Sequence, residues 1–304
     1  MKIAIRPASP FDFHLSASIF AGGDPQIQRY QDGRLWQLIR SGGKLMLAVI
    51  NSRGTVDSPL LQAELHSDGP LQESDLPSAR ARVEGLLNMG LDLLPFYQVA
   101  ERDPVMSGLV SQMRGLHSPT TPTVYEALIT SIVEQQISIR VARNLQMRLV
   151  RAFGRTLTLD GKTYYAFPEP RDLAAARPED LRGCGLSLRK GEYIIGVSRE
   201  IARGRLDLES LAALDDREVI ARLSRMRGIG VWTAELTMVR GMRRFDSIPA
   251  DDLGVRRCIS RYYRQGAGIT GAEAREIASR WKPWRGLASF YLITAEQMGL
   301  AVQE

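Results

Sequence analysis

The chain has 304 residues, of which 44% are hydrophobic and 24% charged, and a net charge of +6, so it can bury substantial cores and is not a disordered or fibrous protein. Its two cysteines, Cys184 and Cys258, are too few for a disulfide framework or a four-cysteine zinc or iron–sulfur site. The N-terminus has no apolar run typical of a signal peptide and no segment is long enough to cross a bilayer, so we expect a cytoplasmic or nucleoid protein without a membrane partner.

Basic charge is concentrated in the second part of the chain. Residues 1–120 carry 11 Lys or Arg against 12 Asp or Glu, whereas residues 121–304 carry 29 against 22. Most of these basic residues are arginines, whose guanidinium groups suit two-point contacts with phosphate. The distribution favours a nucleic-acid partner, although a solvated, arginine-rich helical surface would give the same counts.

The first part of the chain has the pattern of strands joined by turns. Residues 2–5 alternate in polarity, and residues 44–50 form an apolar run that a turn follows. Residues 10–20 have the pattern of a short amphipathic helix. We therefore predict a small α+β domain over residues 1–77, followed by an all-helical region over residues 78–304.

The second part of the chain contains a series of amphipathic helices with recognisable starts. Thr123 and Glu126 have the spacing of a capping box, in which each side chain bonds the backbone N–H of the other residue. Ser138 is placed to cap a second helix that reaches Phe153. Further helices are predicted over residues 187–201, 215–226, 231–241, 252–264, 271–281 and 284–298.

A Gly-Ile-Gly turn between two of these helices is the first candidate functional element. It lies in the segment Met226-Arg227-Gly228-Ile229-Gly230-Val231-Trp232-Thr233-Ala234. Glycines lack a Cβ, so Gly228 and Gly230 allow a phosphate to approach the backbone closely. The amides at the start of the next helix add partial positive charge. An ordinary corner between two helices, with glycine as the C-cap, would have the same pattern.

The acidic turn Pro249-Ala250-Asp251-Asp252 is the second candidate element. It ends 22 residues after Gly230, so its carboxylates have a fixed place relative to whatever the hairpin binds. A predicted helix also begins here, and capping a helix is a common role for aspartate. Asp251 and Asp252 therefore compete for a chemical and a capping role, or divide the two roles with Asp251 as the cap.

Three segments together resemble a known family. They are residues 226–233, the acidic turn and the string Arg280-Trp281-Lys282-Pro283-Trp284-Arg285, and they resemble the helix-hairpin-helix DNA glycosylases, most closely the 3-methyladenine DNA glycosylase II branch. The resemblance covers about residues 120–295. It implies a mostly α fold with an N-terminal α+β domain. It also implies an enzyme of base excision repair that flips alkylated bases such as 3-methyladenine out of double-stranded DNA and releases them.

The resemblance assigns the chemistry to Asp252, which matches the catalytic aspartate of the family. An alkylated purine is already a good leaving group, so the remaining task is to stabilise an oxocarbenium-like sugar, for which a nearby carboxylate is suited. The carboxylate can also orient or deprotonate the attacking water. Bifunctional members carry a lysine at the position of Trp232, and an indole cannot act as a nucleophile. The resemblance therefore implies a monofunctional enzyme without lyase activity.

The resemblance also implies a base pocket and a set of DNA contacts. Trp232 is expected to stack on the alkylated ring, and Gln136 to fill the space that a flipped base leaves. The best-known member has a leucine at the position of Gln136. The expected pocket residues are Trp232, Leu236, Leu253, Phe290 and Ile293. The expected DNA contacts are Gln136, Gly228, Ile229, Gly230 and Thr233.

The resemblance further implies a monovalent cation, Na⁺ or K⁺, at the hairpin. The matching ligands are the backbone carbonyls of Ser224, Met226 and Ile229. No cofactor for catalysis is expected, because the three histidines of the chain are scattered without ligand spacing. We expect a monomer whose partner is double-stranded DNA with damaged bases.

Two other functions stay open on the sequence. One is a glycosylase of the same fold that acts on oxidised or deaminated bases. The other is a non-catalytic DNA-binding protein with the helix-hairpin-helix motif. The acidic turn argues against the second, because carboxylates beside phosphates repel them.

Overall fold

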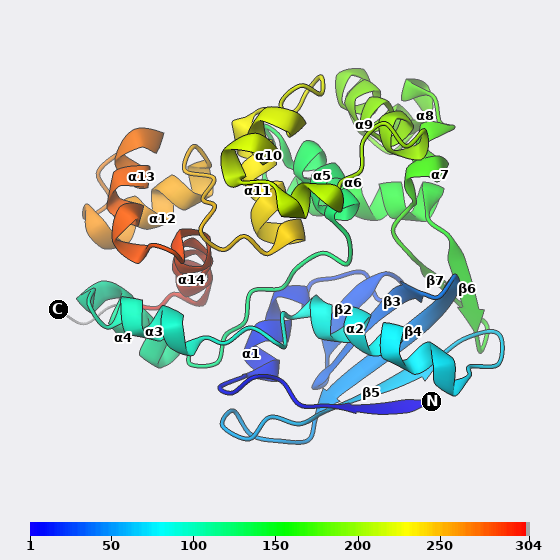
Figure 1. Cartoon of the computed structure of the whole chain (residues 1–304), viewed down its shortest axis with the longest axis horizontal. Helices are drawn as coiled ribbons and strands as arrows, with labels where there is room; N and C mark the ends of the chain where they lie inside the picture. The colour runs from blue at the N-terminus through cyan, green and yellow to red at the C-terminus, as the bar shows by residue number, and fades with distance from the viewer. Residues whose placement is uncertain (302–304) are drawn as a thin grey trace.

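An antiparallel sheet of five strands forms the N-terminal part of the computed structural model, which describes residues 1–301 (Figure 1). Along the sheet the strand order is β1-β5-β4-β3-β2. The alternating burial of β1 and β5 places their apolar side chains on the face that packs on the core. The strands are β1 (Lys2–Ile5), β2 (Gln28–Gln31), β3 (Arg34–Ser41), β4 (Lys44–Ser52) and β5 (Leu61–His66).

Two helices complete the N-terminal core. The helix predicted over residues 10–20 is α1 (Phe13–Ala17), which continues into the 3-10 turn η1 (Ser18–Phe20). Helix α2 (Leu76–Leu86), which follows the turn η2 (Glu73–Asp75), packs on β1 and β3. The core continues to Met89, beyond the expected boundary at residue 77, because α2 buries Val83 and Leu86 against the sheet.

Helices dominate the rest of the chain, and the predicted ones are present. They are α3 (Leu94–Ala100), α4 (Pro104–Gln112), α5 (Val124–Glu134), α6 (Ile139–Phe153), α7 (Pro170–Ala174), α8 (Pro178–Gly183), α9 (Leu188–Ala202), α10 (Asp216–Leu223), α11 (Val231–Met242), α12 (Leu253–Tyr263), α13 (Gly271–Ala278) and α14 (Arg285–Met298), with 3-10 turns η3 (Ser210–Ala213) and η4 (Ser279–Trp281). Among the helices of residues 1–301, none has both the length and the apolar character needed to cross a membrane.

One hairpin interrupts the region that was expected to be all helical. Strands β6 (Thr156–Leu159) and β7 (Lys162–Tyr165) pair antiparallel. Asp160 and Gly161 join them with φ angles of 48° and 73°. Two consecutive positive φ angles give the tight turn whose twist matches a hairpin, so this Asp-Gly pair explains the departure from helix.

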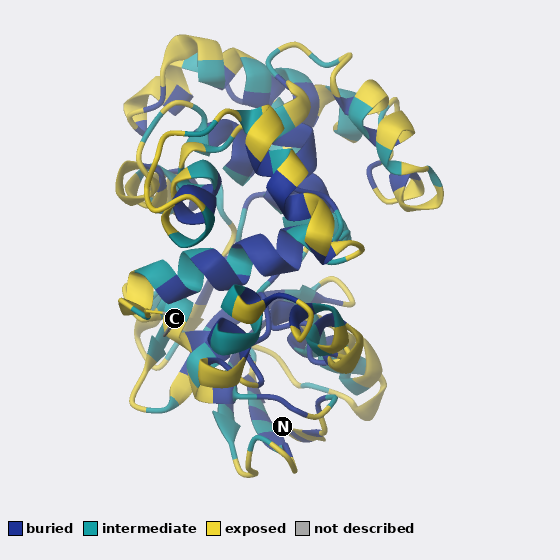
Figure 2. Cartoon of the chain, turned by 90° about the vertical axis from the view of Figure 1, so that its left-hand side faces the viewer, coloured by how far each residue is buried: buried dark blue, intermediate teal, exposed yellow. Residues whose placement is uncertain are grey.

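The helices pack around two separate hydrophobic cores. One core is formed mainly by α5, α9, α10 and α11. The other joins α3 and α4 to α12, α13 and α14, and it encloses the fully buried Trp281 and Tyr291. In Figure 2 the buried residues run through the interior of both groups, while exposed residues mark the outer turns. The connection from α11 to α12 passes from one group to the other and carries the acidic turn.

Candidate functional site

The hairpin between α10 and α11 has two glycines with different roles. Gly228 has a φ of +89°, and a Cβ there would overlap the ring of Tyr193 from α9. At Gly230, the N-cap of α11, a Cβ would have no heavy atom within 4 Å. Packing against Tyr193 therefore explains why residue 228 is a glycine. Of the two glycines, only Gly230 leaves open space for a ligand to approach the backbone closely. Ile229 between them is 4% exposed, so its side chain anchors the turn in the core.

Gln135, which the sequence did not single out, holds the hairpin from the neighbouring helix. Its Nε2 donates to the carbonyl of Gly228 at 2.8 Å and to the hydroxyl of Thr233 at 3.0 Å. Thr233 is buried, so its side chain supports the hairpin from within and does not reach the surface. The partners lie 93 and 98 residues away along the chain, and no local pattern links them.

Gln136, the predicted wedge, projects from the joint between α5 and α6. It has a φ of 56° and is exposed, whereas its neighbour Gln135 points inward. The joint is held by Lys190, whose Nζ donates to the carbonyls of Val133 and Gln135 at 2.7 Å each. Burial lowers the pKa of Lys190. The left-handed backbone at Gln136 therefore directs its side chain outward, from a joint that Lys190 holds in place.

Asp252 caps α12 and is at the same time bound by the hairpin helix. Its Oδ1 accepts the backbone N–H groups of Gly254 at 2.8 Å and Val255 at 3.1 Å. Its Oδ2 accepts the indole Nε1–H of Trp232 at 3.0 Å. One carboxylate therefore joins the two helical groups, with its orientation set by three donors.

Asp251, the rival of Asp252, has a different environment. It is exposed, and its carboxylate lies against Gly271, the first residue of α13. The capping role that both aspartates could fill belongs to Asp252. The contact with Trp232 also belongs to Asp252, so the geometry favours Asp252 as the functional carboxylate.

The remaining pocket residues lie at different depths. Leu236 is 8% exposed and follows Trp232 by one turn of α11, whereas Leu253 is 74% exposed beside Asp252. Phe290 and Ile293 are partly buried on α14, where they pack at the edge of the C-terminal core. The structure thus brings Trp232 and Asp252 into contact and gives Phe290 and Ile293 a packing role.

An ion pair between a buried carboxylate and a half-buried arginine connects the hairpin helix to the acidic turn. Glu235, one turn after Trp232 on α11, accepts from Nη1 of Arg275 on α13 at 2.9 Å. The same Nη1 donates to the carbonyl of Ile248 at 3.3 Å. Burial raises the pKa of Glu235, and the hydrogen bond from Arg275 opposes that rise. The pair ties α11, α13 and the start of the turn together.

Replacement of Arg275 by glutamine is expected to lower the free energy of unfolding by about 3 kcal/mol, because a buried carboxylate would lose its cation. Urea denaturation at neutral pH measures this. The matched control is Arg114→Gln, which breaks an exposed pair with Asp57 and is expected to cost no more than about 1 kcal/mol. Equal losses in the two variants would contradict the assigned role of the pair between Glu235 and Arg275.

The hairpin carbonyls offer ligands for the predicted cation. The carbonyls of Ser224 and Ile229 accept no backbone hydrogen bond from any residue of the described part of the chain. The carbonyl of Met226 accepts one, from the N–H of Ile229 at 3.1 Å. Free carbonyl oxygens in one turn fit a hard monovalent cation. No group of three His, Cys, Asp or Glu side chains within residues 1–301 is arranged to hold a metal ion.

Comparison with known proteins places the glycine hairpin and the acidic turn in one family. A family profile described as "HhH-GPD superfamily base excision DNA repair protein" matches residues 129–283, about half of the chain. The matched region contains the hairpin and the acidic turn. Among curated relatives, a DNA-3-methyladenine glycosylase of Bacillus subtilis is 35% identical over 201 residues, 66% of each chain. The chain spans 58–66% of the length of the first curated relatives that it matches.

Solved structures share the arrangement over nearly the whole chain. A 3-methyladenine DNA glycosylase from Archaeoglobus fulgidus has a TM-score of 0.86 at 26% identity and covers 97% of this chain and 98% of its own. An 8-oxoguanine glycosylase/lyase from Clostridium acetobutylicum, in complex with double-stranded DNA, has a TM-score of 0.76 and covers 99% of both chains. At 18% identity this second likeness extends to the fold alone.

Proposed function

This chain belongs to the HhH-GPD superfamily of base excision DNA repair proteins, and we propose that it is a monofunctional DNA glycosylase for alkylated bases, 3-methyladenine among them. The observation that carries the proposal is the Asp252 carboxylate, which Trp232 binds beside the hairpin. A protein that only binds DNA has no need for an ordered carboxylate at this place. The B. subtilis relative and the A. fulgidus structure favour alkylated bases as substrates.

In the proposed reaction the hairpin grips the DNA backbone. A phosphate lies at the N-terminus of α11, where Gly230 leaves its backbone open. Gln136 enters the base stack in place of the extruded nucleotide. A cation on the carbonyls of Ser224, Met226 and Ile229 would add positive charge at the same phosphate. All of these groups come from one chain, so a monomer is sufficient.

The chemistry then falls to Asp252. The bond between C1′ and the base nitrogen breaks, and the bonding electrons neutralise the positive charge of the alkylated base. Asp252 stabilises the cationic sugar that is left. Water adds to C1′ and loses a proton, and the products are a free base and an abasic site. Trp232 occupies the position from which a lysine would attack, so water is the nucleophile.

A base-release assay tests the proposal. The full-length protein is incubated with duplexes that carry single alkylated, deaminated or oxidised bases, and the released base and the abasic strand are quantified. We expect release of alkylated bases, no strand cleavage and no covalent adduct with borohydride. Release of 8-oxoguanine together with a trapped adduct would instead identify a bifunctional enzyme for oxidised bases.

A further inference from the structure

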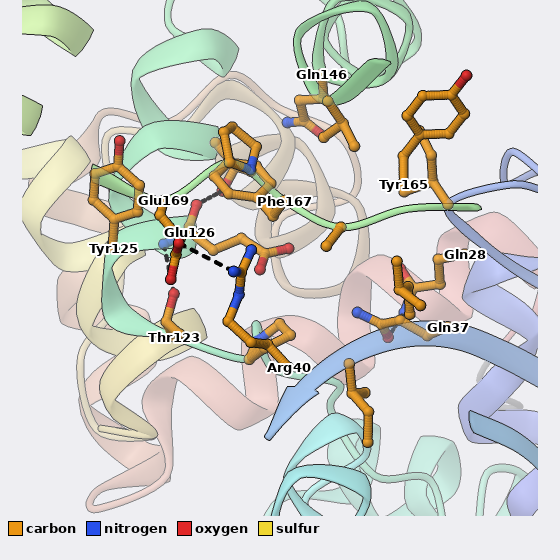
Figure 3. Close-up of a pocket in the computed structure, with 18 of the residues that line it drawn as sticks. Gln28, Gln37, Arg40, Thr123, Tyr125, Glu126, Gln146, Tyr165, Phe167 and Glu169 are labelled. Atoms are coloured by element: carbon orange, nitrogen blue, oxygen red, sulfur yellow. Dashed lines mark hydrogen bonds and ion pairs between the residues drawn. The ribbon is translucent and has the colours of Figure 1, made fainter. Parts of the chain in front are cut away.

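Helix α5 has two ends with different surroundings. Its start, at Thr123 and Glu126, lines a cavity of about 870 Å³ between the N-terminal sheet and the helices α5 and α6 (Figure 3). Its other end, at Gln135, does not line this cavity and contacts the hairpin between α10 and α11. Gln135 is followed directly by the exposed Gln136, which the proposed function inserts into the base stack. This end of α5 therefore connects the proposed wedge to the hairpin.

The side-chain amide of Gln135 uses both of its N–H groups on the hairpin and its helix. Its Nε2 donates to the carbonyl of Gly228 at 2.8 Å and to Oγ1 of Thr233 at 3.0 Å. A carbonyl can only accept, so the amide nitrogen of Gln135 must face Gly228. Thr233 follows Trp232, whose indole binds Asp252. The two bonds therefore link the residue before the wedge to the turn itself and to the first turn of α11.

The backbone of the same joint is held by a third helix. Nζ of Lys190 on α9 donates to the carbonyls of Val133 and Gln135 at 2.7 Å each. Carbonyls at the C-terminal end of a helix lack partners within the helix, and a cation stabilises them. Lys190 thus holds the end of α5 to α9, and the side chain of Gln135 holds it to the hairpin.

We propose that Gln135 is a positioning residue that keeps the Gln136 wedge at a fixed distance from the hairpin. The hairpin holds the phosphates, while the wedge enters the stack of the same duplex, and separating a paired base from its stack costs free energy. Phosphate contacts can offset that cost only if the hairpin and the wedge do not move apart. The proposal rests on the proposed function, from which it takes the roles of the hairpin and of Gln136.

Gln135→Leu removes both donors and keeps a side chain of similar size. We expect it to slow the release of 3-methyladenine paired with thymine at least about tenfold, because two hydrogen bonds are lost. The same lesion opposite an abasic site has no partner base to leave, so its release should change less than about threefold. Single-turnover kinetics on the two duplexes measures both rates. Equal losses on both duplexes would indicate general damage to the site and overturn the positioning role.

The variant is expected to stay folded, because α5 and α11 also pack closely at their other ends. A Cβ at Gly241 of α11 would lie 2.8 Å from the Cβ of Ala127 on α5. Affinity for an undamaged duplex should stay within about threefold of the parent, since it depends on phosphate contacts. Gln112→Leu is the matched control, because Nε2 of Gln112 also donates to two backbone carbonyls, both outside the hairpin. It should change neither release rate.

A second variant tests whether Gln135 acts through the wedge. Gln136→Ala removes the wedge itself and should slow the release of the paired lesion far more than that of the unpaired one. Adding Gln135→Leu to it should cost less than about a further threefold, because a positioning residue has no effect without the group that it positions. Losses that multiply in the double variant would show that the two glutamines act independently, and would overturn the proposal.

Fluorescence separates this proposal from the proposed function. A 2-aminopurine base beside an abasic-site analogue becomes brighter when its stacking is disturbed, and no bond has to break. The parent should raise this fluorescence on binding, and saturating Gln135→Leu should give a rise at least about twofold smaller. If the parent released no base from any duplex, the proposed function would fail, while this comparison would still decide the role of Gln135. Equal rises in the two proteins, or no rise in either, overturn the proposal.

Discussion

Replacement of Asp252 by asparagine is expected to slow base release about 10²–10³-fold while the protein stays folded and still binds duplex DNA. The amide removes the negative charge that would stabilise the cationic sugar. Asparagine is as good an N-cap as aspartate, so its amide oxygen can still accept from the start of α12. Its amide NH2 group replaces the oxygen that accepts from Trp232, so that hydrogen bond is lost as well. Single-turnover kinetics on a duplex with one 3-methyladenine measures the effect.

The neighbouring carboxylate supplies the control for this experiment. Asp251→Asn removes the same charge one residue earlier, but Asp251 is exposed and the indole N–H of Trp232 donates to Asp252 instead. We expect its rate to change by less than about tenfold, because an exposed charge is largely screened. If Asp251→Asn reduced the rate more than Asp252→Asn, the two aspartates would have to exchange roles.

Local patterns account for what could be predicted. The capping residue Ser138 and the glycines of the hairpin determine their own backbone within a few residues, so their positions follow from the sequence. The same holds for strand β1, whose alternation reflects one buried face, and for the apolar run of β4, which is buried at three successive residues, Met46, Leu47 and Ala48. These elements fix the fold and the place of the acidic turn. The sequence did not settle which of Asp251 and Asp252 caps α12.

Contacts between distant segments explain what the sequence could not predict. The bond from Gln135 to Gly228 and the packing of Tyr193 on that glycine depend on how α5, α9 and the hairpin come together. The predicted capping box at Thr123 and Glu126 is only half formed for a similar reason: the Thr123 hydroxyl accepts from the N–H of Glu126, but the Glu126 side chain faces a cavity that the N-terminal sheet helps to form. In each case the position of the side chain depends on segments that are distant in sequence, so the residues next to it do not predict it.

Alanine substitutions at the two hairpin glycines are expected to affect different properties: Gly228→Ala the stability of the fold, and Gly230→Ala the binding of DNA. Gly228→Ala should lower the free energy of unfolding by about 2–4 kcal/mol, because alanine is strained at a φ of +89° and its methyl group would displace the ring of Tyr193. Thermal or urea denaturation measures the loss. An unchanged midpoint would show that the hairpin can shift away from Tyr193 without cost.

Gly230→Ala is the matched variant, because it adds the same methyl group two residues later in open space. We expect it to cost no more than about 1 kcal/mol of stability, the usual difference between glycine and alanine at an N-cap. Its methyl group would, however, stand where a phosphate must approach the N-terminus of α11, so duplex binding should weaken by at least about tenfold. Fluorescence anisotropy with an undamaged duplex at fixed salt measures this, since phosphate contacts act on any sequence. If Gly230→Ala bound DNA as tightly as the parent protein, the contacts with the DNA phosphates would have to be assigned to another part of the protein surface.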